Sequence, residues 1–348
     1  MTLYKDADWQ GVYNLAKAQT VQGIAFDGLI NVSSSIPWIA SCVDETLTID
    51  WMEQLVKITR RNMLINTAIN IVSSRLDNVG VHYIFMKGQV CGARWPIPEH
   101  RVSGDCDVIL LEEDFKKAEK VFMSMGATKR EGAEFKHVEY CLDTISWEIH
   151  FSVHRFGQER LQWIIDGWVT DELQANNCKL RIADDITVPA FLPDLEITYL
   201  LLHFVNHIIH EGCGMRQLID FVLVLQRNLP NCAASCLLDK IEALQLTRAF
   251  HATLYLCEIV LGVEWPLSVI EVLVPNGYSK LEMYLACKME QRMMIDGNFG
   301  HATGWQKPKG LWGSFCYNWR SFRREIHFIP LWPREMLLFP IEVIRRKA

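Results

Sequence analysis

Two aspartates with one residue between them, Asp105 and Asp107, stand where an apolar run begins. If that run is a strand, side chains at positions i and i+2 point to the same face, about 7 Å apart along the chain. Carboxylates at this spacing can hold two divalent cations, and cations about 4 Å apart activate an attacking oxygen and stabilise a leaving pyrophosphate. A bare Asp-x-Asp pair is also typical of a solvated turn, so its surroundings decide between the two interpretations.

A third carboxylate is usually needed to complete such a site, and Glu148 is the candidate. Apolar and polar side chains alternate along residues 146–151, which predicts a strand with Glu148 and His150 on its polar face. A neighbouring strand would place Glu148 beside Asp105 and Asp107, and these three are the predicted catalytic and metal-binding residues. His150 could orient Glu148 or contact an acceptor, or it is a partly buried strand histidine.

A phosphate-binding group is predicted one strand upstream of the aspartate pair. The apolar run 81–86 ends at Lys87-Gly88, where a lysine and a helix N-terminus could hold phosphate. Gly104 directly precedes the pair and would permit close approach of the backbone to a ligand. Arg101 could reach a triphosphate, or it forms a salt bridge within its loop. The predicted binding residues are Lys87, Gly88, Arg101, Ser103 and Gly104.

Three histidines fall on one face of a helix predicted over 193–211. His203, His207 and His210 are spaced i, i+4 and i+7, and Glu196 lies on the same side. This stripe could bind zinc, line a cleft as a polar surface that contacts the acceptor or nucleotide, or make a helix–helix contact. The motif His-Glu-x-x-His is missing, which argues against a zinc protease.

Two other features of the C-terminal half allow more than one interpretation. Arg216 and Asp220 lie one helical turn apart, which predicts an intrahelical ion pair or a domain-interface contact, with Arg216 in the cleft as the alternative. Residues 305–346 mix tryptophans with lysines and arginines. This region is predicted to contain packed tryptophans and solvated cations, with a nucleic-acid or membrane surface as the alternative.

The composition is that of a globular protein. Of 348 residues, 50% are hydrophobic and 22% are charged, which supplies enough apolar material for a sizeable core. The formal net charge of −6 argues against a nucleic-acid partner. The N-terminus lacks a signal-peptide pattern, and no run of about 20 apolar residues predicts a transmembrane helix. The 11 cysteines are odd in number and scattered, as expected for reduced thiols in a soluble cytoplasmic protein.

The hydrophobic periodicity changes along the chain from helical to strand-like and back. Between 80 and 155, strands and helices follow a β-α-β-α-β-β order, which is typical of an α/β or α+β core. Asp114 is the predicted N-cap, and Gly126 the predicted end, of one helix there. The predicted helices cover 7–27, 49–78, 115–125, 193–211, 215–228, 233–246 and 247–262, and the predicted strands cover 81–86, 108–111, 136–142 and 145–151.

Three motifs follow one another in a fixed order. They are Phe-Met-Lys-Gly at 85–88, Arg-x-Ser-Gly-Asp-x-Asp at 101–107 and Trp-Glu-Ile-His at 147–150. Together they resemble the nucleotidyltransferase superfamily that includes DNA polymerase β and the aminoglycoside adenylyltransferases. The sequence is more closely similar to a bacterial branch known as uncharacterised nucleotidyltransferases, to which the helical motifs at 202–210 and 215–220 also correspond. The resemblance covers about residues 50–230.

The resemblance implies transfer of a nucleoside monophosphate from an NTP, expected to be ATP, to a small-molecule or protein acceptor, with release of pyrophosphate. Asp105 and Asp107 would bind Mg²⁺ or Mn²⁺, and Glu148 would help to activate the acceptor. One departure concerns the first strand–helix turn, where the superfamily has Gly-Ser and this sequence has Lys87-Gly88. The lysine could replace the serine as a point charge on the β- and γ-phosphates.

The implied fold is α+β, with a small mixed-sheet nucleotidyltransferase core, N-terminal helices and a large C-terminal helical domain. The predicted segments are 1–79, 80–185 and 186–348. The first hypothesis for function is a Mg-dependent nucleotidyltransferase, favoured by the three intact carboxylates. The second is a catalytically inactive nucleotide-binding or scaffold protein, favoured by Lys87-Gly88. The third is a metal hydrolase built on the histidine stripe.

Overall fold

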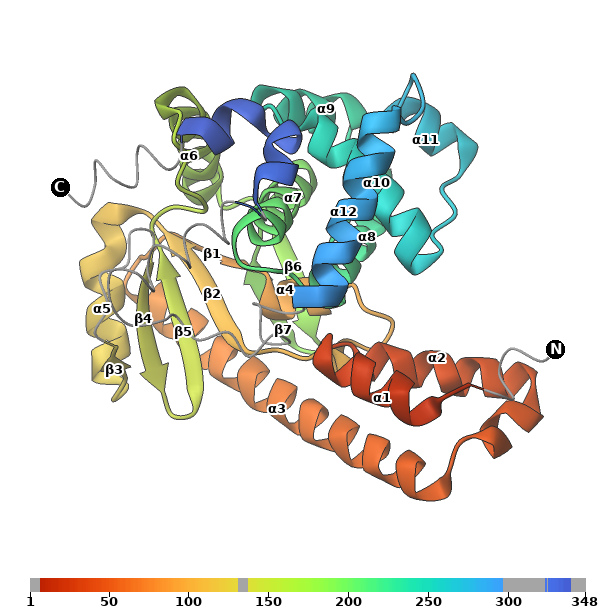
Figure 1. Cartoon of the computed structure of the whole chain (residues 1–348). Coiled ribbons are helices and arrows are strands. Elements are labelled where there is room, and N and C mark those ends of the chain that lie inside the picture. The colour runs from red at the N-terminus through yellow and green to blue at the C-terminus, as the bar shows by residue number, and fades with distance from the viewer. Residues whose placement is uncertain (1–6, 131–136, 297–322, 324, 339–348) are drawn as a thin grey trace, which may run out of the picture. The chain divides into compact units, whose positions relative to one another are not determined.

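The computed structural model describes residues 7–130, 137–296, 323 and 325–338 (Figure 1). The chain divides into two compact units, which are described separately below. The first comprises Met1–His150 and Cys178–Ala190, and the second comprises Phe151–Asn177 and Phe191–Ala348. The three segments expected from the sequence remain a prediction.

The first unit is built on a five-stranded mixed sheet. Its order is β1-β2-β5-β4-β3, with β2 and β5 parallel and the remaining pairs antiparallel. This confirms the predicted α+β class with a mixed sheet. The strands are β1 (Tyr83–Met86), β2 (Asp105–Leu110), β3 (Thr128–Lys129), β4 (His137–Leu142) and β5 (Ile145–His150).

One face of the sheet carries the hydrophobic core of this unit. Phe85, Val108 and Trp147 point into it and are at most 3% exposed. Helix α3 (Glu45–Asn78) and helix α5 (Phe115–Ser124) supply the other side of the core with aliphatic and aromatic residues such as Ile69 and Phe122. Because side chains alternate along a strand, residues 105, 107, 148 and 150 lie on the opposite face. The core therefore fixes the strands whose other face carries the polar residues.

The N-terminal helices differ from the prediction in one respect. The single helix expected over 7–27 is two helices, α1 (Trp9–Ala18) and α2 (Gln22–Ser35). The chain turns between them at Thr20, whose φ of 56° lies outside the helical region. The indole of Trp51 on α3 donates a 2.8 Å hydrogen bond to the carbonyl of Gln22, which ties α2 to the long helix.

The helix after β2 begins where the sequence predicts, but Asp114 does not cap it through its side chain. The Asp114 carboxylate instead accepts a hydrogen bond from the backbone N–H of His82 at 2.9 Å and contacts Lys117 at 2.6 Å. This aspartate therefore links the start of α5 to the residue before β1.

A second, two-stranded sheet was missed by the sequence analysis, which expected helices to dominate after residue 155. It consists of β6 (Lys179–Ala183) and β7 (Ile186–Pro189) and belongs to the first unit. Buried Ile182 and Val188 belong to the same hydrophobic core as β1 and α3. The chain thus returns to the first unit after an intervening helix.

The second unit is helical, and its predicted helices are confirmed with small changes at the ends. Helix α7 begins with Pro193 at its first turn and ends before Gly212, as predicted. The helices are α6 (Glu159–Ala175), α7 (Pro193–His210), α8 (Met215–Asn228), α9 (Ala234–Ala243), α10 (Thr247–Leu261), α11 (Leu267–Leu273) and α12 (Lys280–Asp296).

Part of the Trp/Arg-rich region lies outside the described residues, including Trp305, Trp312 and Trp319. Trp332 is described and is 2% exposed, with its indole donating to the carbonyl of Leu244 at 3.1 Å. For this tryptophan the predicted packed state is confirmed. Within the described ranges no helix has the length and apolar character needed to cross a membrane. The ten cysteines in these ranges are free thiols.

Candidate active site

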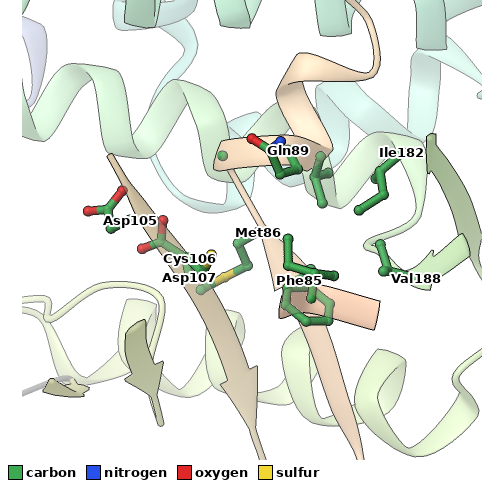
Figure 2. Close-up of a pocket in the computed structure, with 11 residues that line it drawn as sticks. Phe85, Met86, Gln89, Asp105, Cys106, Asp107, Ile182 and Val188 are labelled. Carbon is green, nitrogen blue, oxygen red and sulfur yellow. The ribbon is translucent and has the colours of Figure 1, made fainter. Parts of the chain in front are cut away.

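The strand register brings together the three carboxylates predicted from the sequence. Strands β2 and β5 run parallel, with Asp105 opposite Ser146 and Asp107 opposite Glu148. Residues aligned across neighbouring strands share a face, so Asp105, Asp107 and Glu148 project from the same side of the sheet. Asp105 is partly exposed, whereas Asp107 is 1% exposed. Figure 2 shows both aspartates on β2.

Asp107 is held by a lysine and a histidine. One of its carboxylate oxygens, Oδ1, lies 2.6 Å from the Lys87 ammonium and 3.0 Å from Nε2 of His150. Burial by itself would raise the pKa of Asp107, but the Lys87 charge and the His150 hydrogen bond outweigh it and hold that pKa well below its usual range. Asp107 is therefore ionised at neutral pH.

Glu148 is also held in its charged form. Its Oε2 lies 3.1 Å from Nε2 of His150. Burial raises the pKa of Glu148 and the nearby Asp107 charge adds to this, but the hydrogen bond from His150 and the charge of Lys87 lower the pKa overall. Two ionised carboxylates on adjacent strands form an oxygen-rich site of the kind that divalent cations prefer.

Lys87 reaches Asp107 through an unusual backbone conformation. It directly follows β1 and has φ 48° and ψ −142°, a region that non-glycine residues rarely adopt and that costs about 1–3 kcal/mol. A short helix, α4 (Gly88–Gly92), begins directly after Lys87, so the predicted strand–helix junction is present, and its phosphate-binding role stays a prediction. The ammonium that was expected to hold phosphate contacts the Asp107 carboxylate.

Gly88 and Gly104 differ in what their surroundings require. Gly88 has φ +41°, and a Cβ there would lie 3.3 Å from the carbonyl oxygen of Asp105. A side chain at Gly104 would meet no atom within 4 Å. The space beside Gly104 is open, and the expectation that the backbone there lets a ligand approach closely stays a prediction.

A chain of hydrogen bonds fixes the loop before β2. Buried Arg101 donates to the Ser103 hydroxyl at 3.2 Å, and this hydroxyl donates to Oε1 of Gln89 at 2.6 Å. The amide of Gln89 in turn donates to Asn66 on α3 at 2.7 Å. Arg101 and Ser103 thus lie next to the aspartate pair and position its loop. Gln89 was not predicted as a site residue, and it is the first residue after the Lys87-Gly88 turn.

The cavity beside the aspartates is small. Its volume is about 10 Å³, and Met86, Gln89, Asp105 and Asp107 are among the residues that line it (Figure 2). A cavity of this size holds about one water molecule. It is too small for a nucleotide.

His137 on β4 is a polar neighbour that the sequence analysis missed. It pairs with His150 across the β4–β5 hairpin, and the two ring centroids are 4.9 Å apart. The signal was present in the sequence. The turn at Asp143-Thr144 was predicted correctly, and counting outward from it places residue 137 opposite residue 150.

The histidine stripe lies on α7 in the second unit. The rings of His203 and His207 are 4.3 Å apart, and His207 contacts Glu211 at 2.9 Å. Glu196 accepts a hydrogen bond from Asn228 at 2.8 Å. Within the described residues, the group with metal-ligand spacing is His137, Glu148 and His150, so the zinc interpretation of the stripe is not supported. Arg216 lies in the first turn of α8.

A family model described as an uncharacterised nucleotidyltransferase matches residues 5–262. The chain belongs to this family. No curated protein matches the chain.

Two solved structures show weaker similarity. The solution structure of the antibiotic-resistance factor ANT(2'')-Ia is 11% identical, with a TM-score of 0.36 over 56% of this chain and 96% of that chain. The crystal structure of an antigenic nucleotidyltransferase-like protein from Paracoccidioides brasiliensis is 14% identical, with a TM-score of 0.32 over 52% of this chain and 91% of that chain. The family assignment rests on the family model.

Proposed function

We propose that this protein transfers a nucleoside monophosphate from an NTP, with ATP as the expected donor, to a small-molecule or protein acceptor. Pyrophosphate is the second product. The observation that carries the proposal is the register of β2 against β5, which sets Asp107 opposite Glu148 and Asp105 two residues away on the same face. Membership of a nucleotidyltransferase family supports the same reaction class.

The donor set fits a divalent metal of the magnesium or manganese class. Its carboxylates are those of Asp105, Asp107 and Glu148, and the pKa values of Asp107 and Glu148 are lowered so that both carboxylates are charged. When bound, the metal would activate the attacking oxygen and neutralise charge on the leaving pyrophosphate.

The chain's own residues have separate roles in this proposal. Asp105 and Asp107 would hold the cation, and through it the triphosphate, beside β2. Glu148 accepts the proton of the acceptor hydroxyl or amine. Arg101 and Ser103 keep the loop before β2 in place through their hydrogen bonds to each other and to Gln89.

A thermal-shift panel tests the proposal. ATP, GTP, CTP and UTP are each added with and without Mg²⁺ to the wild-type chain, Asp105→Asn and Glu112→Gln. Glu112 is an exposed carboxylate just beyond the far end of β2 and serves as the matched control. A ligand at 100 times its dissociation constant stabilises by about 2.7 kcal/mol, which moves the midpoint by several degrees.

The expected result is a Mg-dependent shift with at least one nucleotide that Glu112→Gln retains and Asp105→Asn loses. An equal shift in wild type and Asp105→Asn would show that nucleotide binds elsewhere and would refute the site.

A second candidate function is a nucleotide-binding or scaffold protein without catalysis. The short contact between Lys87 and Asp107 favours it, because the ammonium already neutralises a carboxylate that a metal would use. This alternative predicts nucleotide binding that does not depend on Mg²⁺ and no cleavage between the α- and β-phosphates.

A further inference from the structure

A second group of potential metal ligands lies beside the aspartate pair, on β4 and β5. His137 and His150 stand opposite each other in the antiparallel pair, and Glu148 precedes His150 by two residues on the same face. The two histidines are 7% and 2% exposed, respectively. The group therefore combines two buried imidazoles with one partly exposed carboxylate.

The distances within the group are close to those of a metal centre. Oε2 of Glu148 lies 3.1 Å from Nε2 of His150 and 3.8 Å from Nδ1 of His137. One ligand atom from each of the three residues lies within 4.8 Å of the other two. Ligands about 2.0–2.1 Å from a tetrahedral zinc ion stand about 3.4 Å apart, between the two measured separations.

The two carboxylates next to Nε2 of His150 also favour a bound cation. Nε2 of His150 lies 3.0 Å from an oxygen of Asp107 and 3.1 Å from an oxygen of Glu148, yet one ring nitrogen carries at most one proton. Asp107 also receives the Lys87 ammonium. A divalent cation between His150 and Glu148 would be coordinated by the nitrogen lone pair and the carboxylate together.

The surroundings of His137 fit a ligand histidine. Metal-bound histidines generally direct their other ring nitrogen toward a carboxylate or carbonyl group. Here Nδ1 of His137 faces Glu148, while Nε2 lies 4.0 Å from the carboxylate of Glu139. Glu139 is held in turn by Arg130 at 3.1 Å.

We propose that, when no nucleotide is bound, His137, Glu148 and His150 bind one divalent transition-metal ion of the zinc class, at a site that shares Glu148 with the cation site of Asp105 and Asp107. Two imidazoles and one carboxylate, with a fourth position open, suit zinc and its neighbours, whereas magnesium prefers oxygen ligands. The inference is independent of nucleotide transfer, because it concerns metal affinity in the absence of nucleotide.

Cobalt(II) serves as the spectroscopic probe for the test. The full chain is freed of metal with a chelator and titrated with Co²⁺, whose visible absorption reports tetrahedral coordination. Bound Co²⁺ is then displaced with Zn²⁺. The variants are His137→Gln, His150→Gln and Asp105→Asn, with His82→Ala as the matched control. His82 contacts the Asp114 carboxylate at 3.0 Å, away from the group.

The expected result is one equivalent of tightly bound metal in wild type, His82→Ala and Asp105→Asn, with affinity reduced at least tenfold in each of the two glutamine variants. The difference between wild type and His137→Gln separates this site from the cysteines of the chain. Circular dichroism confirms that each variant is folded, and His137→Gln and His150→Gln act as independent tests should one fail to fold.

Three outcomes would overturn the inference. They are no stoichiometric binding by the wild type, wild-type affinity in a folded glutamine variant, or a loss in Asp105→Asn as large as in the histidine variants. None of them depends on whether the protein transfers nucleotides. Equally, absence of nucleotide transfer leaves the predicted metal affinity unchanged.

Discussion

Replacing Lys87 with methionine removes the charge that neutralises Asp107 while keeping the length of the side chain. In the wild type the ammonium lies 2.6 Å from the carboxylate, and the two side chains are 16% and 1% exposed. After the substitution Asp107 keeps its hydrogen bond from His150 at 3.0 Å but loses its cation. The buried Asp107 carboxylate then lacks the lysine charge beside it.

The size of the effect follows from the burial of the pair. Removing one partner of a buried ion pair lowers the free energy of unfolding by about 3–5 kcal/mol. Because Asp107 keeps its hydrogen bond from His150, we expect Lys87→Met to lose about 3 kcal/mol, the lower end of this range. In a unit of this size, each kcal/mol of lost stability lowers the unfolding midpoint by about 2–4 °C, so the midpoint should fall by about 6–12 °C.

Lys117→Met is the matched control. Lys117 also lies 2.6 Å from an aspartate, Asp114, but its side chain is 53% exposed. Asp114 is itself buried but keeps its hydrogen bond from the backbone N–H of His82, so losing the exposed lysine should cost about 0–1 kcal/mol, or less than about 4 °C. The assay is scanning calorimetry at pH 7, which resolves separate transitions if the two units unfold independently.

The pH dependence of the difference is a second check. The pKa of Asp107 is lowered in the folded state, so the stability that the pair contributes is present above the unfolded pKa of about 3.9 and is lost as pH falls through the folded value. The difference in unfolding midpoint between wild type and Lys87→Met should therefore be largest near pH 7 and become smaller toward pH 3. Equal midpoints for Lys87→Met and Lys117→Met at pH 7 would refute the reasoning.

Three smaller predictions use other contacts. Gly88→Ala should destabilise the protein by about 1–2 kcal/mol, because Gly88 has φ +41° and the new Cβ would lie 3.3 Å from the carbonyl oxygen of Asp105. Gly104→Ala, whose Cβ would point into open space, should change the stability measured by thermal unfolding by less than about 0.5 kcal/mol. Ser103→Ala should cost about 1 kcal/mol in the same assay, because it breaks the 2.6 Å hydrogen bond to Gln89; an unchanged midpoint would contradict that role. Burial raises the pKa of Glu172 to about 7, so the free energy of unfolding falls as pH rises from about 4.5 through 7. Glu172→Gln should therefore gain about 2 kcal/mol over the wild type at pH 8 and much less at pH 5, and a gain independent of pH would disprove the assignment.

The parts of the fold that were predicted correctly depend on local patterns. The alternation of apolar and polar residues located β5, and the turn at Asp143-Thr144 located the hairpin that joins it to β4. The Pro193 start and Gly212 end of α7 are likewise local signals. Because the aspartate pair and Glu148 lie in such strands, their common face could be predicted as well.

The features that were missed depend on tertiary contacts. The side chain of Lys87 reaches Asp107 because its backbone adopts φ 48°, which no sequence pattern indicates for a lysine. The β6–β7 hairpin is short and follows a helix of the second unit, so its return to the first unit depends on packing of residues such as Val188. The break at Thr20 interrupts an apolar pattern that is continuous in the sequence.

The most direct test of the central claim is to identify which phosphate bond is cleaved. The chain is incubated with Mg²⁺ and each of the four NTPs, so that water can serve as a slow acceptor, and products are separated by chromatography. The account predicts nucleoside monophosphate and pyrophosphate from the wild type and at least a hundredfold less from Asp105→Asn. Nucleoside diphosphate and phosphate as products, or equal pyrophosphate release by wild type and Asp105→Asn, would contradict it.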